Sequence, residues 1–164
     1  MPRTYHNLGL SFQYPDNWLL DESDANAEST DIGESHSISV SSPGGAFWTL
    51  VKHHVSQEPA RALETGLAAM REVYPDLDVE RTEEEIAGHR LSGYELNFIC
   101  LDLTNTAVLQ SFRTPAGSFL IMYQADDREF AQVKHVFDAI TISLLKSLTP
   151  QKEATWPPQR FFTD

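Results

Sequence analysis

Four strand-like segments follow one another between residues 79 and 125, and only short turns separate them. They are Val79–Ile86, Leu91–Leu101, Ala107–Phe112 and Phe119–Ala125. Leu91–Leu101 has Tyr94, Leu96, Phe98 and Cys100 on one face, and Phe119, Ile121 and Tyr123 alternate along the last segment, as expected for strands. Strands joined by such short turns pair as antiparallel neighbours. The second half of the chain therefore predicts an antiparallel meander.

An earlier segment, Ala46–Val55, indicates what covers the sheet. Its large apolar side chains fall on both faces, with Phe47, Val51 and Val55 on one face and Trp48 and Leu50 on the other. A strand that is apolar on both faces is typical of a sheet covered on both sides. This pattern favours a sheet between helices over a sheet with one wet face.

Two helices are predicted, one on each side of the meander in sequence. The first begins near Pro59 and ends before Pro75, and its apolar stripe consists of Leu63, Leu67, Met70 and Tyr74. The second begins at Asp126 or Asp127, where Asp126 and Glu129 have capping-box spacing. Its stripe consists of Phe130, Val133, Phe137 and Ile140. Both stripes are interpreted as core-facing surfaces.

The 164 residues are enough for one domain with its own core. Short strands are also predicted at Ser11–Tyr14, Trp18–Leu20 and Ser37–Ser41. We therefore expect one α+β domain over residues 1–146, followed by a tail over residues 147–164. The tail is expected to dock on the domain or on a partner.

The charge argues against several classes of partner. Twelve Lys and Arg residues stand against 24 Asp and Glu residues, which gives a formal net charge of −12. Such a surface repels nucleic-acid phosphates and anionic membranes, so neither is an expected partner. It attracts basic proteins, although it also simply confers solubility. The N-terminus leads into no apolar signal segment, so a cytoplasmic location is expected.

No catalytic or metal-binding motif is recognisable. Cys100 is the only cysteine and lies in an apolar run, where an inert core role is expected. His53 and His54 are adjacent in a strand and point to opposite faces, and the six histidines show no metal-ligand spacing. The sequence also lacks a nucleophile elbow and a glycine-rich phosphate loop. We therefore predict a protein that is not an enzyme and needs no cofactor.

The acidic segment Asp21–Glu34 has the composition of a calcium loop but not its spacing. When Asp24 is aligned with the first EF-hand ligand, Ser29 occupies the position that needs glycine and Ser35 the position of the bidentate glutamate. A solvated loop is the simplest interpretation, with a weak cation site as an alternative. A third interpretation is a docking surface for a basic partner, with Asp24 and Asp31 among the contacts.

The order of elements resembles the PsbP/Mog1 superfamily, which includes bacterial DUF1795-type proteins. The likeness covers about residues 4–145 and includes the Tyr-Pro-x-x-Trp element Tyr14–Trp18 and the closing helix with Phe137 and Ile140. It implies a central antiparallel sheet with helices on both faces. Members include extrinsic subunits of photosystem II, a regulator that binds the small GTPase Ran, and chaperones for secreted effectors. Most are binding proteins, and no motif carries functional residues across to this chain.

The C-terminal stretch Trp156–Phe162 is the most suggestive feature outside the predicted core. Trp156, Phe161 and Phe162 are costly to leave in water, so they pack either on the domain itself or against a partner or second copy. We therefore predict a non-catalytic interaction protein, an adaptor or chaperone, that binds another protein. The alternative is a small-ligand or metal-ion binding protein that uses a cleft between sheet and helix.

Overall fold

The computed structural model describes residues 1–23 and 35–149, which form nine strands and two helices. The strands are β1 (Arg3–Asn7), β2 (Leu10–Tyr14), β3 (Leu19–Ser23), β4 (His36–Ser41), β5 (Phe47–His53), β6 (Asp78–Ile86), β7 (His89–Cys100), β8 (Leu103–Thr114) and β9 (Gly117–Asp126). The helices are α1 (Pro59–Val73) and α2 (Asp127–Ser147). Strands β1 and β2 form a separate hairpin. The other seven form one antiparallel sheet in the order β3-β4-β5-β9-β8-β7-β6.

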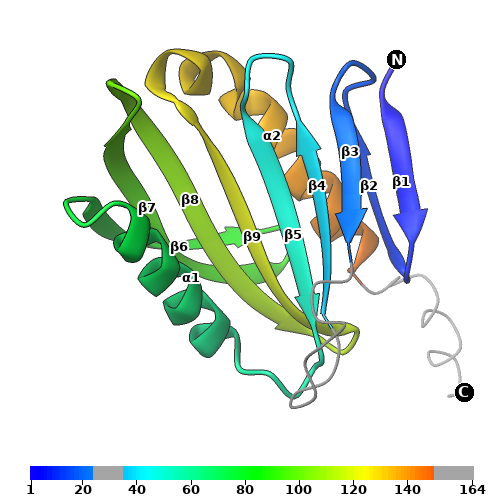
Figure 1. The fold of residues 1–164 in the computed structure, drawn as a ribbon. Helices are drawn as coiled ribbons and strands as arrows, with labels where there is room; N and C mark the ends of the chain where they lie inside the picture. Colours follow the sequence, from blue (N-terminus) through cyan, green and yellow to red (C-terminus); the bar gives the residue numbers. More distant parts are fainter. Residues whose placement is uncertain (24–34, 150–164) are drawn as a thin grey trace, which may run out of the picture.

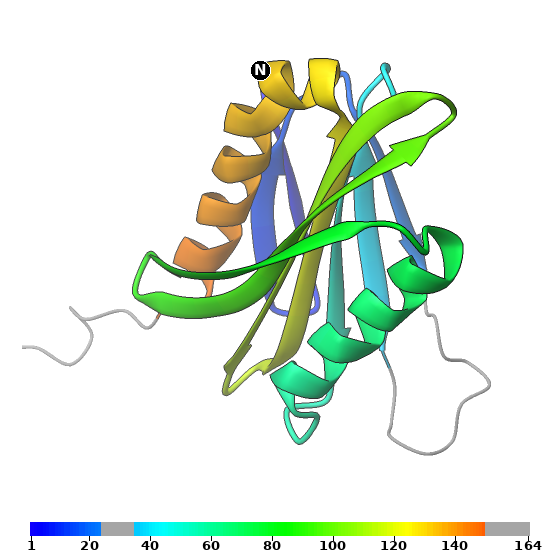
Figure 2. The same ribbon diagram turned by 90° about the vertical axis from the view of Figure 1, so that its left-hand side faces the viewer.

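The helices lie on opposite faces of the seven-stranded sheet, so the predicted α+β layering is confirmed (Figures 1 and 2). Helix α1 packs on β7, β8 and β9. Helix α2 packs on β8 and β9 and, more extensively, on β2 of the separate hairpin. The hairpin and α2 thus form one layer together. No helix in the described residues combines the length and apolar character needed to cross a bilayer.

Helix α1 begins and ends at the predicted prolines. Pro59 occupies the first turn, where its missing N–H costs nothing, and Tyr74 closes the helix before Pro75. Leu63 and Leu67 are buried against the sheet and form a cluster with residues of β7 and β8. The predicted stripe therefore faces the core.

Helix α2 is anchored at its first residue and in its middle. The Asp126 carboxylate accepts a hydrogen bond from the Glu129 backbone N–H at 3.0 Å, which confirms the predicted cap. The Glu129 side chain itself accepts a hydrogen bond from the Ser42 hydroxyl at 2.6 Å and so ties the helix to the turn after β4. Three turns further on, the Trp48 indole N–H donates to the Thr141 hydroxyl at 2.9 Å.

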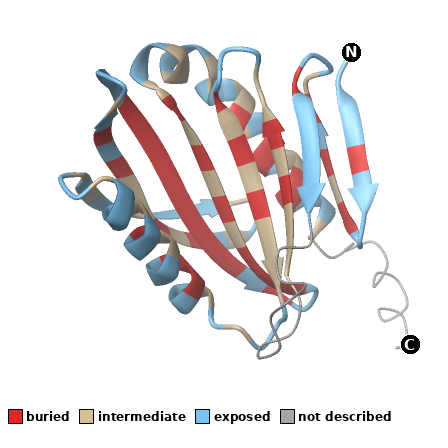
Figure 3. Cartoon of the chain, viewed as in Figure 1, coloured by how far each residue is buried: buried red, intermediate tan, exposed pale blue. Residues whose placement is uncertain are grey.

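The core lies mainly between the sheet and the layer of α2 and the hairpin. Strand β8 is buried over most of its length, as Figure 3 shows. In β5, Trp48 and Leu50 are fully buried on the side of α2, whereas Phe47 and Val51 on the other face are half-buried. Helix α1 contacts β7, β8 and β9, so it covers the β5 face only in part.

The N-terminal strands differ from the prediction. Strand β1 was not predicted, because only Tyr5 is buried among its five residues and no apolar alternation marks it. The two predicted strands that follow, β2 and β3, do not pair with each other: β2 pairs with β1, and β3 pairs with β4. The Pro15–Trp18 turn therefore carries the chain from the hairpin into the main sheet, and Trp18 packs edge-on against Phe137 of α2.

Tyr123 in β9 makes the core sensitive to alkaline pH. Burial, followed by the charges of Asp138, Glu84 and Glu95, raises its pKa above the ordinary value of 10.0. As pH rises, the unfolded chain therefore loses the Tyr123 hydroxyl proton before the folded chain does. The contribution of this group to the unfolding free energy is complete below pH 10 and is lost progressively above it. We expect the unfolding free energy to fall between pH 9 and pH 11 by about 1.4 kcal/mol more in the wild type than in Tyr123→Phe. Urea titrations at both pH values would measure this difference, and parallel pH profiles would contradict it.

Candidate functional site

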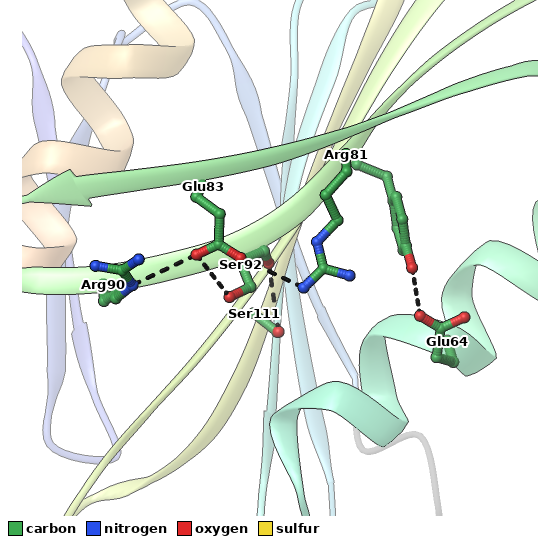
Figure 4. Close-up of polar contacts among 7 residues, drawn as sticks. Glu64, Arg81, Glu83, Arg90, Ser92 and Ser111 are labelled. Atoms are coloured by element: carbon green, nitrogen blue, oxygen red, sulfur yellow. Dashed lines mark hydrogen bonds and ion pairs between the residues drawn. The ribbon is translucent and has the colours of Figure 1, made fainter.

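One polar network occupies the outer part of the sheet, on the side of α1. Glu83 of β6 accepts a hydrogen bond from the Ser92 hydroxyl at 3.2 Å and forms ion pairs with Arg81 at 3.3 Å and Arg90 at 3.4 Å (Figure 4). The hydrogen bond from Ser92, together with the arginines, lowers the pKa of Glu83. A carboxylate held in its ionised form is a weak general base, so the Ser92–Glu83 contact gives no reason to assign a nucleophile.

The same network joins the edge strand to α1. The Tyr94 hydroxyl donates to the Glu64 carboxylate of α1, and the Arg81 guanidinium lies 5.5 Å from the centre of the Tyr94 ring (Figure 4). The hydrogen bond to Glu64 and burial raise the pKa of Tyr94. These contacts fix α1 to β6 and β7, and we assign them a structural role.

The end of the β7–β8 hairpin exposes apolar side chains instead. Ile99, Leu101 and Leu103 are 67%, 90% and 54% exposed, and Val73 at the end of α1 is 65% exposed. These four residues are the hairpin-tip surface. The register places Ile99 opposite Thr104 and Leu103 opposite Cys100, so these two side chains lie on alternate faces of the hairpin. Single exposed apolar residues are ordinary, and what distinguishes these four is that they gather at the end of one hairpin and of α1.

The turn that carries Leu101 is also conformationally costly. Leu101 and Asp102 are the two residues between the paired Cys100 and Leu103, and both have positive φ values of 54° and 66°. This is the geometry of a type I′ turn, which favours Asn-Gly or Gly-Gly. The described turns Leu8-Gly9 and Ala87-Gly88 share this geometry, but each has glycine at its second position. Leu101 thus gains neither burial nor a favoured backbone conformation.

An acidic pocket opens beside the hairpin-tip surface. It has a volume of about 560 Å³, and its apolar wall includes Val73, Phe98 and Ile99. Asp76, Asp78 and Asp127 also line it. The Asp127 carboxylate accepts a hydrogen bond from the Thr106 hydroxyl at 2.7 Å. The apolar wall and the acidic groups together suit a partner segment that is both apolar and basic.

The cysteine and histidines show no shared site. Cys100 is half-buried and accepts a hydrogen bond from the Tyr74 hydroxyl at 3.4 Å. Burial lowers the pKa of His53, whereas His54 bonds to Ser56 and His89 packs on Phe112. Within residues 1–23 and 35–149, no group of three His, Cys, Asp or Glu side chains could hold a metal ion.

The predicted partner contacts and the surface found in the structure are different residues. Trp156, Phe161, Phe162, Asp24 and Asp31 lie outside the described residues, so their roles stay predictions. The hairpin-tip surface was missed because Leu101 looked like the end of a predicted strand. The available signal was Leu101-Asp102 itself, a pair without glycine between two long alternating segments.

Comparison with known proteins identifies the architecture. No protein-family model matches the sequence, and no curated protein matches it either. The solution structure of cyanobacterial PsbP (CyanoP) from Synechocystis is similar over 87% of this chain and 90% of that chain, with a TM-score of 0.57 and 10% identity. Weaker likenesses, each with a TM-score of 0.46 and 11% identity, are to PA94 of Pseudomonas aeruginosa and LpqN of Mycobacterium tuberculosis. They span 92% and 85% of this chain and 97% and 86% of those chains, respectively. LpqN is described as involved in cell envelope biogenesis.

At 10% identity the likeness to CyanoP concerns the fold and not the activity. In this chain, that fold is a seven-stranded antiparallel sheet with a helix on each face. The chain therefore has the PsbP/Mog1-like fold that the order of its sequence elements predicted.

Proposed function

We propose that this chain is a non-catalytic interaction protein, an adaptor or chaperone-like domain, that binds another protein through the hairpin-tip surface. The observation that carries the proposal is Leu101, which is 90% exposed in a left-handed turn conformation. A bulky residue in that conformation costs about 1–2 kcal/mol, and its side chain gains nothing in the free protein. Burial of a leucine in an interface recovers about 1.5–3 kcal/mol.

The charge around the surface indicates the chemistry of the partner. The pocket beside it contains three aspartates, and the whole chain has a formal net charge of −12. A partner segment with apolar anchors and flanking Lys or Arg complements both features, and the charge also accelerates association at low salt. The C-terminal aromatic residues remain a second proposed contact, either with the partner or with another copy of this chain.

The test compares two full-length variants in binding to a partner captured from the native cells and then purified. Leu101→Asn combined with Leu103→Thr removes two of the four exposed apolar side chains of the surface while suiting the turn and the strand. Leu19→Thr is the matched control, because Leu19 is 75% exposed on edge strand β3. We expect the double variant to bind about tenfold more weakly or worse, and the control to change by less than about twofold. Isothermal titration would measure both.

Three results would count against this proposal. Equal binding by the double variant and the wild type would remove the hairpin tip as the contact. If substitution of Trp156, Phe161 and Phe162 by serine abolished binding instead, the contact would move to the tail. A wild-type chain with no saturable protein partner would contradict the interaction function itself.

A further inference from the structure

A second cavity lies between α2 and the sheet, away from the hairpin-tip surface. It has a volume of about 210 Å³, enough for roughly seven water molecules or a small organic group. We call it the sheet–helix cleft. Its lining consists of Glu84 and Ile86 of β6, Gln110 of β8, Tyr123 of β9, and Lys134, Asp138, Thr141 and Ile142 of α2.

Two buried side chains bring unpaired oxygen atoms to this cleft. Tyr123 is 5% exposed and Gln110 is 3% exposed. In the described part of the chain, the Tyr123 hydroxyl has no hydrogen-bond partner, and Gln110 bonds only through its Nε2, which donates to Glu84 at 2.9 Å. Among the described residues, the unpaired polar side-chain atoms that are completely shielded from solvent are Thr82 Oγ1 and Ser118 Oγ. The Tyr123 and Gln110 oxygens are not among them. Both oxygens therefore keep access to the cleft that their residues line.

Two of the other polar side chains in the cleft, Lys134 and Thr141, are already engaged with protein partners. Lys134 binds both carboxylate oxygens of Asp138, at 2.8 and 2.9 Å. The Thr141 hydroxyl donates to the Phe137 carbonyl oxygen at 2.9 Å while it accepts from Trp48. Three acceptors remain available to a ligand, namely the Glu84 carboxylate and the side-chain oxygens of Gln110 and Tyr123, although the Tyr123 hydroxyl also keeps its own O–H as a donor.

The charges around the cleft also favour a positively charged ligand. Burial raises the pKa of Tyr123 most, and the nearby charges of Asp138, Glu84 and Glu95 raise it further. Lys134 is the only cation among the lining residues. An anion would be repelled here, and the described carboxylates are not grouped to hold a metal ion. A ligand with delocalised positive charge and several N–H groups matches both the acceptors and the apolar walls of Ile86 and Ile142.

We propose that the sheet–helix cleft binds a guanidinium group, with Glu84 as its charged acceptor and the Gln110 and Tyr123 oxygens as neutral acceptors. A guanidinium is planar, weakly hydrated and rich in donors, so it loses less on entering a half-apolar cleft than an ammonium group does. The proposal is independent of the hairpin-tip surface, because no residue lines both cavities.

The experiment is a two-dimensional amide NMR titration of the full-length protein with methylguanidinium chloride at low ionic strength. N-methylurea serves as the uncharged ligand of the same shape. We expect methylguanidinium to shift the amides of β6, β9 and the middle of α2 with a dissociation constant on the order of 1 mM. N-methylurea should bind about tenfold more weakly or worse, because it lacks the charge that Glu84 recognises.

Three variants connect the signal to the cleft. Glu84→Gln should weaken binding about tenfold, and Tyr123→Phe should weaken it severalfold while keeping the aromatic packing. Glu85→Gln is the control, because the adjacent residue points to the other face of β6 and makes the same change in charge. That variant should bind like the wild type to within about twofold. An unchanged backbone spectrum for each variant would show that it folds.

Each outcome decides the proposal. A lack of saturation, equal shifts with N-methylurea, or unchanged binding by Glu84→Gln would overturn it. If methylguanidinium binds as expected, two further ligands distinguish the possible natural sources of the guanidinium group, namely agmatine and an end-blocked Gly-Arg-Gly peptide. If the peptide saturates the same amides as tightly as methylguanidinium, the natural ligand is an arginine side chain of a polypeptide. If agmatine binds and the peptide does not, it is a free guanidinium compound.

Discussion

Gly93→Ala is expected to destabilise the domain by about 3 kcal/mol or more. A Cβ atom at position 93 in β7 would lie 1.9 Å from the Leu109 carbonyl oxygen and 3.0 Å from the Gln110 Cα atom of the neighbouring strand. Both atoms belong to the backbone of β8, which is paired on its other side with β9 and cannot move away alone. Urea denaturation followed by tryptophan fluorescence would measure the loss.

Gly66→Ala provides the matched control. Gly66 is inside α1, and a Cβ atom there would meet Leu120 and Leu109 side-chain atoms at 3.5 and 3.7 Å, which are ordinary contacts. Alanine in a helix is favoured over glycine, so this variant should gain about 0.5–1 kcal/mol. If the two variants had the same urea midpoint, the close approach of the β8 backbone would not explain why position 93 is a glycine.

Phe137→Ala is expected to cost about 3–5 kcal/mol. Phe137 is fully buried in the middle of α2. Its ring centre lies 4.6 Å from that of Tyr123, 5.8 Å from that of Phe130 and 6.0 Å from that of Trp18. Truncation therefore leaves a cavity where the sheet, α2 and the start of β3 meet. Thermal and urea unfolding, followed by tryptophan fluorescence, would both measure the loss, because Trp18 lies at the cavity.

Val73→Ala is the control for a small apolar truncation at the surface. Val73 is 65% exposed at the end of α1, so its loss should change stability by less than about 0.5 kcal/mol. A loss below about 2 kcal/mol for Phe137→Ala would mean that Trp18 and Tyr123 close the cavity by moving together. The aromatic cluster would then be less rigid than its packing indicates.

The local parts of the fold could be predicted from the sequence, because their signals lie within a few residues. Strands β7 and β9 show alternation, and the short turns predict that β6 to β9 pair in sequence order, as they do. The caps and stripes of the helices are equally local, as Asp126 shows. The order of the sheet depends instead on distant pairing: β5 lies beside β9, with Trp48 opposite Tyr123. No pattern in either strand alone specifies that partner.

The candidate surface was missed for a different physical reason. Alternation identifies Ile99 and Leu103 as strand residues but not whether another element covers them. Here Ile99 and Leu103 remain 67% and 54% exposed, so neither helix covers them. The sheet–helix cleft was anticipated only as a location. Its acceptors, Gln110 and Tyr123, come from separate strands. That their side-chain oxygens lack hydrogen-bond partners can be seen only in the structure.

The shared layer of α2 and the N-terminal hairpin governs when the chain can fold during synthesis. The Gln13 backbone N–H donates to the Ser143 hydroxyl at 2.9 Å, although these residues are 130 positions apart. A ribosome that adds about 5–20 residues per second needs roughly 6 to 26 s to make the second partner after the first. Throughout that interval, the apolar face of the hairpin with Phe12 has no helix to pack on. The growing chain therefore exposes this face until α2 leaves the ribosome.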